Sequence, residues 1–230
     1  MPLILVRRAF VSDRRIPLLH KMMSHVKSGM VLIEMPDFHG DFALNVHSHL
    51  AYRVMLYGRY EPEYAEICRR ECKPNRDAID VGANVGFYSV LLGKTVATNR
   101  RVLSIEPTHG AFAYLCANIE RNGLTGKVLA EQIIASDTDV PRSLTVFVGH
   151  EEYSSIGEFD NLNAPDAERQ IVETKARTID ALCEEHNLEP GFIKIDVEGF
   201  EHHVLQGAMT ILRNQGSNIP CVKTKYGTLD

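Results

Sequence analysis

The stretch Ala78-Ile79-Asp80-Val81-Gly82-Ala83-Asn84-Val85-Gly86-Phe87-Tyr88-Ser89 decides the fold. It predicts a short buried strand, a loop with two glycines and a helix that opens at Gly86. Gly82 and Gly86 let the backbone pass close beneath a ligand, because glycine has no side chain and tolerates positive φ. The unpaired N–H groups at the helix start would attract a carboxylate, and Asp80 would attract an ammonium group. This combination matches the methionine end of S-adenosylmethionine.

Two other interpretations of this stretch stay open. A nicotinamide dinucleotide favours three glycines in a G-x-G-x-x-G pattern. Here Asn84 stands at the middle position and Phe87 at the third. An acid at position 80 would also repel a pyrophosphate. The second interpretation is a strand-to-helix turn with no ligand, which a lone G-x-x-x-G motif does not exclude. A second acid after the next strand favours the cofactor.

Two acids follow the next predicted strands. Residues 101–105 predict a strand that ends at Glu106, where a carboxylate could accept both hydroxyls of a ribose. Glu106 could also begin the helix predicted for residues 108–122. Residues 127–134 predict a third strand. Asp137 after it could accept from the amino group of adenine or could belong to a turn. The predicted cofactor site in this half consists of Asp80, Gly82, Asn84, Gly86, Glu106 and Asp137.

The first third of the chain predicts an extension that leads into this site. Residues 30–34 and 42–46 predict a β-hairpin, which could lie over the cofactor as a lid or cap a sheet edge. Pro62 suits the first position of a helix. Just before it, Tyr60 and Glu61 could touch the methionine end of the cofactor or could be a core ring and a helix cap. They complete the candidate cofactor residues.

Length and composition bound the organisation. At 230 residues and 44% hydrophobic, the chain can bury one sizeable core. We expect an N-terminal extension over residues 1–76, with a helix or arm at 14–27, and an α/β domain over residues 77–230. The net charge is −5, and the sequence contains no basic stripe. Nucleic acid is therefore not expected as a partner. No apolar run is long enough for a membrane span. The start lacks a signal-peptide pattern. These features predict a cytoplasmic protein.

Metal chemistry is not expected. The five cysteines form no C-x-x-C pair, and the ten histidines form no H-x-x-x-H pair. A cluster of carboxylates could still bind a metal, and the sequence does not exclude it.

Three motifs in order resemble the FkbM family of methyltransferases that use S-adenosylmethionine. They are Asp-Val-Gly-Ala-Asn-Val-Gly-Phe-Tyr-Ser at residues 80–89, Ile-Glu-Pro at 105–107 and Lys-Ile-Asp-Val-Glu-Gly-Phe-Glu at 194–201. A Gly-x-Tyr-Glu-Pro-Glu lead-in stands at 58–63, and the similarity runs over residues 42–212. The resemblance implies a Rossmann-like domain with helices on both sheet faces. It also implies methylation of a hydroxyl on a sugar, a glycan or a polyketide-type product.

The third motif holds the candidate catalytic residues. Residues 192–198 predict a buried strand in which Lys194 and Asp196 share one face. Asp196 and Glu198 are the candidates for holding the acceptor and removing its proton. Lys194 would keep Asp196 ionised or stabilise a developing alkoxide. Alternatively, Lys194 and Asp196 form a structural ion pair, and Glu198 only charges a helix N-terminus. On the next helix, predicted for residues 199–213, His202 and His203 are expected at the surface, although one could act as the base.

The region between the third and fourth strands predicts an insertion. Residues 143–148 alternate as a strand, and residues 158–170 predict a polar loop or cover. Ser154 and Ser155 lie between these segments. The family has a serine-containing segment here, so they either face the acceptor or form a polar turn.

The end of the chain departs from the family pattern. Residues 218–226 predict a fifth strand without the acid that usually stands there. The sequence offers no residues for the last helix and for the antiparallel strand pair that normally close the sheet. We therefore expect an exposed sheet edge, which a homodimer could cover. The alternative is a shortened, non-catalytic relative that keeps the cofactor fold.

Overall fold

A computed structural model describes residues 3–6, 29–147, 155–156, 168–197, 199–214, 221–224 and 227–229. Its centre is a six-stranded sheet with the strand order β14-β13-β12-β4-β5-β6. β14 pairs antiparallel with β13, and all other pairings in this sheet are parallel. The strands are β4 (Asp77–Val81), β5 (Val102–Ile105), β6 (Val128–Glu131), β12 (Pro190–Ile195), β13 (Cys221–Thr224) and β14 (Gly227–Leu229).

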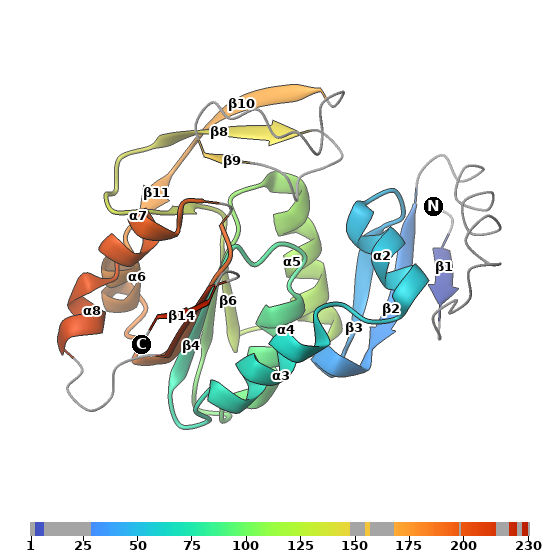
Figure 1. Ribbon diagram of the computed structural model, residues 1–230, viewed down its shortest axis with the longest axis horizontal. Helices are drawn as coiled ribbons and strands as arrows, with labels where there is room; N and C mark the ends of the chain where they lie inside the picture. The colour runs from blue at the N-terminus through green and yellow to red at the C-terminus, as the bar shows by residue number, and fades with distance from the viewer. Residues whose placement is uncertain are drawn as a thin grey trace.

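Helices cover both faces of the central sheet, which confirms the predicted α/β fold (Figure 1). One face carries α3 (Pro62–Glu71), α4 (Phe87–Thr95) and α5 (His109–Arg121), and the other carries α6 (Ile179–Glu185), α7 (Glu201–Gln206) and α8 (Met209–Asn214). Side chains alternate along β4, so Ile79 and Val81 pack in the core with α6, whereas Ala78 packs in the core with α4. No helix among the described residues is both long and apolar enough to cross a membrane.

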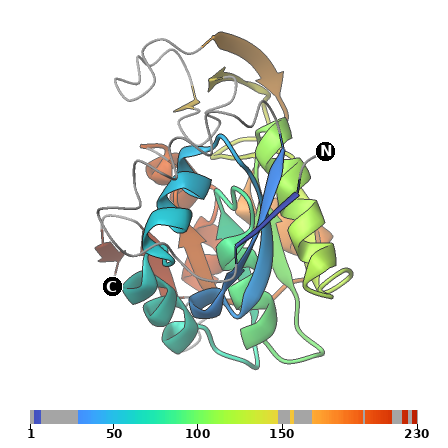
Figure 2. The ribbon, with the colours of Figure 1, turned by 90° about the vertical axis from the view of Figure 1, so that its right-hand side faces the viewer.

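The predicted N-terminal hairpin is present but lies elsewhere than expected. β2 (Met30–Met35) pairs antiparallel with β3 (Gly40–Asn45) around the short helix η1 (Pro36–Phe38), and β1 (Leu3–Val6) pairs parallel with β2. These strands form an extra layer outside α4 and α5 (Figures 1 and 2). The hairpin therefore packs on helices and does not cap an edge of the central sheet. An unpredicted helix, α2 (His49–Tyr57), follows it and starts at the N-cap Ser48. Residues 14–27 lie outside the described residues.

Two asparagines, one in α5 and one at its C-cap, attach the hairpin to the domain. The carboxamide of Asn118 accepts from the amide of Ala43 at 2.7 Å and donates to its carbonyl at 3.1 Å. One turn later, Asn122 makes the same pair of bonds with Asp41, at 3.1 and 2.8 Å. Because a helical turn and two strand residues rise by similar lengths, the two carboxamides meet alternate residues of β3. They thereby satisfy its backbone in the way that a neighbouring strand would.

The insertion forms a small antiparallel sheet above the central one (Figure 1). Its strand order is β10-β8-β9, with β8 (Arg142–Phe147), β9 (Ser155–Ile156) and β10 (Arg169–Thr174). The predicted third strand is shorter than expected, because β6 ends at Glu131 and the chain then enters β7 (Ile134–Ala135), which pairs with β11 (Ala176–Arg177). Ser155 lies in β9, whereas Ser154 and most of the predicted polar cover lie outside the described residues.

Two expectations about the C-terminal part are wrong. The helix expected over residues 199–213 is two helices, α7 and α8, with a break at Gly207, where an added Cβ would lie 1.9 Å from the carbonyl oxygen of Ser136. The chain also supplies one antiparallel strand after the fifth parallel strand, since β14 pairs with β13. The sequence pattern hid this strand because β14 is only three residues long.

Candidate functional site

The glycine loop and the end of β12 are in direct contact. Gly82 has a φ of +71°, and a Cβ added there would lie 1.9 Å from the carbonyl oxygen of Asp196. Any other residue would therefore be strained and would collide with backbone. Gly86 has a φ of +92°, and its Cβ would lie 2.8 Å from a side-chain carbon of Leu115 on α5. The loop thus fits between β12 and α5 because residues 82 and 86 are both glycine.

The first turn of α4 keeps donors for a ligand. The amides of Gly82 and Ala83 both donate to the carbonyl of Ile105, at 3.0 Å each, which fixes the loop against β5. The first helical bond runs from Val90 to Gly86 at 3.0 Å. Among the described residues, no acceptor bonds the amides of the first helical turn, residues 87–89. This turn fits the carboxylate that the sequence predicted for it.

Glu106 braces the loop from the end of β5. One carboxylate oxygen accepts from the amide of Asn84 at 2.8 Å. The other accepts from the amide and the hydroxyl of Thr108, at 2.9 and 2.6 Å, at the start of α5. Burial raises the pKa of Glu106, although these bonds oppose the rise. Its expected role at the helix start is therefore present, and the oxygen that accepts from Asn84 keeps a lone pair for the predicted ribose contact.

Asp80, which the sequence offered as a partner for an ammonium group, is enclosed in the structure. It is 0% exposed. Lys194 donates to one of its oxygens at 2.9 Å, and Ser89 on α4 donates to the other at 2.6 Å. The cause is the strand register, because Lys194 on β12 lies directly opposite Asp80 on β4. Asp80 therefore holds Lys194 and Ser89 in place beside the glycine loop.

Lys194 contacts the glycine loop and the helix that follows it. Its ammonium donates to the carbonyl of Gly82 at 3.1 Å and lies 4.9 Å from the ring centre of Tyr88. Burial alone would lower the pKa of Lys194, but the carboxylates of Asp80 and Asp196 outweigh burial and raise it. Lys194 is therefore a cation at neutral pH that ties the glycine loop to β12. Its hydrogen-bonded carboxylate partner is Asp80, and not Asp196 as the sequence suggested.

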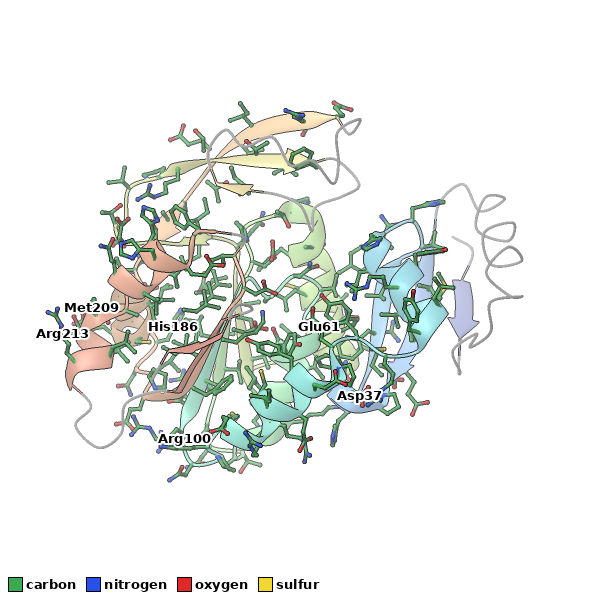
Figure 3. The ribbon with its side chains drawn as sticks, in the orientation of Figure 1. Asp37, Glu61, Arg100, His186, Met209 and Arg213 are labelled. Atoms are coloured by element: carbon green, nitrogen blue, oxygen red, sulfur yellow. The ribbon has the colours of Figure 1, made fainter. Side chains whose placement is uncertain are left out.

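Tyr60 and Glu61 enter the site from the chain before α3. Glu61 precedes the helix in a left-handed conformation with a φ of 43°, and it accepts from the hydroxyl of Tyr88 at 3.0 Å. Tyr60 packs 5.5 Å from the ring of Phe87. Pro62 occupies the first turn of α3, as predicted. In Figure 3, Glu61 lies above and to the right of Arg100, which precedes β5 in the chain.

Asp137 lies in an ion pair beside β7. Arg142 donates to its carboxylate at 2.5 Å and to the hydroxyl of Ser136 at 2.8 Å. Burial alone would raise the pKa of Asp137, but the bonds from Ser136 and Arg142 lower it. The guanidinium of Arg142 also lies 5.2 Å from the ring centre of Phe200, and that ring stacks on His203 at 4.1 Å. Asp137 thus links the insertion to the segment that carries the third motif.

On the acceptor side, the structure describes one of the two proposed acids. Asp196 follows β12 and is half-buried, and its amide donates to the carbonyl of Val81 at 3.1 Å. Its negative charge raises the pKa of Tyr60 and Tyr64, after burial, which is the larger cause. Glu198 lies outside the described residues. His202 is exposed and His203 is half-buried against Phe200.

Sequence reasoning missed residues that act through the backbone of the loop. Asn118 is 0% exposed and donates at 2.8 Å to the carbonyl of Val85, within the glycine loop. Its signal was a polar residue on the apolar stripe of α5, between Leu115 and Ile119. Ser89 gave no such signal, because its partner Asp80 belongs to another element. Within the described residues, no group of acids, cysteines and histidines could hold a metal ion.

Comparison with known proteins shows which family the chain resembles. The model of the Methyltransferase FkbM domain matches residues 80–224. Among solved structures, a methyltransferase FkbM from Methylobacillus flagellatus KT is 15% identical over 92% of this chain and 48% of its own, with a TM-score of 0.45. M. jannaschii TYW2, in complex with AdoMet, is 21% identical over 49% of each chain, with a TM-score of 0.38. An O-methyltransferase from Bacillus cereus, in complex with SAH, is 14% identical over 81% and 55%, with a TM-score of 0.35. The matched region thus spans about half of these chains. No curated protein matches the sequence.

Proposed function

Because the chain belongs to the FkbM methyltransferase family, we propose that it methylates a hydroxyl oxygen of a small-molecule or glycan acceptor, such as a sugar or a polyketide-type product. Its cofactor is S-adenosylmethionine. The observation that carries the proposal is the contact between the glycine loop and the end of β12, since a Cβ on Gly82 would lie 1.9 Å from the carbonyl oxygen of Asp196. This contact brings the proposed acceptor acid beside the loop that fits the cofactor.

The described residues suggest how the cofactor is held. The free amides at the start of α4 would bind its carboxylate, and Glu61 would receive its ammonium group. Glu61 supports this role because its left-handed conformation is strained for a residue with a side chain, and such strain gathers at functional sites. Glu106 would accept from the ribose hydroxyls. Asp137 would accept from the amino group of adenine with the part of its carboxylate that Arg142 leaves free.

The chemistry requires alignment and a base. The bound cofactor supplies a methyl group on a positively charged sulfur. Asp196 would hold the acceptor hydroxyl in line with this group and take its proton as the new oxygen–carbon bond forms. Glu198, two residues on, is the second candidate for this task. Lys194 would act by positioning, because its three contacts fix Asp80, the carbonyl of Gly82 and the ring of Tyr88.

The cellular setting belongs to the same proposal. We propose a cytoplasmic enzyme with a small-molecule or glycan acceptor and without a nucleic-acid partner, consistent with the net charge of −5. A homodimer was expected to cover the edge of the fifth parallel strand. This expectation has less support, because β14 of the same chain already pairs with β13 along that edge.

Calorimetric titration with S-adenosylhomocysteine tests the cofactor half. We expect binding by the wild type and loss of at least about tenfold in affinity for Glu106→Ala, since hydrogen bonds to charged groups contribute roughly 1.5–3 kcal/mol. Glu131→Gln is the matched control, because Glu131 ends the neighbouring strand β6 and pairs with His186 at 3.1 Å. Circular dichroism confirms that each variant is folded.

An acceptor screen tests the catalytic half. S-adenosylhomocysteine release is measured with sugars, glycans and polyketide-type alcohols, for the wild type and Asp196→Asn. Turnover that Asp196→Asn abolishes while cofactor affinity stays unchanged supports the proposal. A folded protein that binds the cofactor and methylates no hydroxyl favours the non-catalytic relative.

A further inference from the structure

Within the part of the chain that the structure describes, β10 pairs only with β8 and forms an edge of the small sheet. The sheet order β10-β8-β9 places this strand at the outside, and residues 169–173 are all exposed. Two of them are aliphatic, since Ile171 is 64% and Val172 is 44% exposed. An exposed edge strand with apolar side chains is a template for pairing with another strand. The question is which strand fits it.

The charges along β10 complement those of a second copy running in the opposite direction. In a two-fold symmetric antiparallel pair, the axis passes between one residue and its own copy, so one residue must face itself. With Ile171 on the axis, Arg169 lies opposite Glu173 of the partner subunit, and the symmetry creates this pair twice. Residues 169, 171 and 173 share one face of the strand. The result is an apolar contact between two opposite-charge pairs, which is favourable across strands.

The neighbouring symmetric registers are worse. With Val172 on the axis, Ile171 would lie opposite Glu173 of the partner subunit, and Arg169 would lie opposite Lys175 of the partner subunit. With Gln170 on the axis, Arg169 would face an isoleucine. Charge complementarity therefore selects one register out of those that symmetry allows.

We propose that the protein forms a two-fold symmetric dimer in which β10 pairs with β10 of a second copy, with Ile171 on the axis. The small sheet then continues across both chains as β9-β8-β10-β10-β8-β9. Pairing leaves the chain's own sheet intact, because Arg169 lies opposite Phe147 and Glu173 opposite Ser143 on β8. The guanidinium of Arg169 lies 5.5 Å from the ring centre of Phe147 on β8, so it must swing toward the edge of the sheet to meet Glu173 of the partner subunit.

Charge reversal tests the register. Arg169→Glu and Glu173→Arg each turn both opposite-charge pairs into like-charge pairs. Each is expected to raise the dimer dissociation constant at least about tenfold. An equimolar mixture of the two variants is expected to form heterodimers, because both pairs then join opposite charges again. The double variant Arg169→Glu/Glu173→Arg is expected to regain the homodimer. Analytical ultracentrifugation and native mass spectrometry give the readouts.

Glu168→Arg is the matched control. It makes the same charge change as Glu173→Arg on the same segment, but in this register it faces the neutral Thr174 of the partner subunit. It should leave the dimer within about threefold of the wild type. S-adenosylhomocysteine affinity should stay unchanged in all these variants, which shows that they are folded. A wild type that is monomeric at roughly 100 μM overturns the proposal, as does a mixture of the single variants without heterodimers.

Discussion

Asn118 donates a 2.8 Å hydrogen bond to the carbonyl oxygen of Val85, inside the glycine loop. The same carboxamide pairs with both backbone groups of Ala43 on the hairpin. One buried side chain therefore joins the N-terminal layer to the loop that would hold the cofactor. The N-terminal layer, which belongs to the extension expected over residues 1–76, thus contacts the glycine loop directly.

Replacing Asn118 should weaken cofactor binding as well as folding. Asn118→Ala removes three hydrogen bonds in a buried place, so we expect a loss of about 2–4 kcal/mol in the free energy of unfolding. Because Val85 loses its partner, S-adenosylhomocysteine affinity should fall at least about tenfold. Asn122→Ala is the control, since Asn122 pairs with Asp41 and does not contact the loop. It should be destabilised by about 1–2 kcal/mol with unchanged affinity. Equal losses of affinity in both variants would contradict the coupling.

Gly82 should tolerate no side chain. Gly82→Ala places a Cβ against the carbonyl of Asp196 and strains a φ of +71°, so we expect loss of cofactor binding and a large loss of stability. Gly123 has a similar φ of +69° but nothing within 4 Å of an added Cβ. Gly123→Ala should therefore cost only the backbone strain, about 1–2 kcal/mol. Urea unfolding of both variants separates the cost of the collision from the cost of the strain. Similar unfolding midpoints for the two variants would contradict the collision at Gly82.

The pair of Lys194 and Asp80 should show strong coupling. Lys194→Met leaves the carboxylate of Asp80 charged, buried and without its cation, which is expected to cost about 3–5 kcal/mol. The double variant Lys194→Met/Asp80→Asn removes both charges and should be more stable than Lys194→Met alone. The measurement is a double-mutant cycle by urea unfolding. Additive losses would show that the pair does not interact.

Glu106 should make cofactor binding sensitive to acid. Burial raises the pKa of Glu106, so the folded protein takes up this proton at a higher pH than the unfolded chain. The stability contributed by this group therefore increases as the pH falls from the folded pKa toward the ordinary value of about 4.3. Cofactor affinity should decrease over the same range, because a protonated carboxyl accepts fewer hydrogen bonds. Calorimetry from neutral pH down toward the ordinary value of about 4.3 should show this decrease in the wild type. Glu106→Gln should lack it, and parallel pH profiles for the two proteins would count against this role.

The sequence predicted features that depend on local pattern. The two glycines, the acid at the end of β5 and the place of Pro62 in the first turn of α3 were all identified. The partner of Lys194 was not, because the choice between Asp80 and Asp196 depends on which strand lies beside β12. Asp80 is 114 residues away along the chain. The role of Asn118 depends in the same way on where the hairpin packs.

The contact between Gly82 and the carbonyl of Asp196 also limits how this enzyme can change. The backbone at the end of β12 contacts the backbone of the glycine loop, so neither segment can be displaced alone. If Asp196 holds the acceptor as proposed, new acceptors must be accommodated by side chains around Asp196 and by the insertion, while the spacing between donor and acceptor stays constant. Exchanging the insertion between relatives should then alter which acceptor is recognised without requiring a new cofactor site.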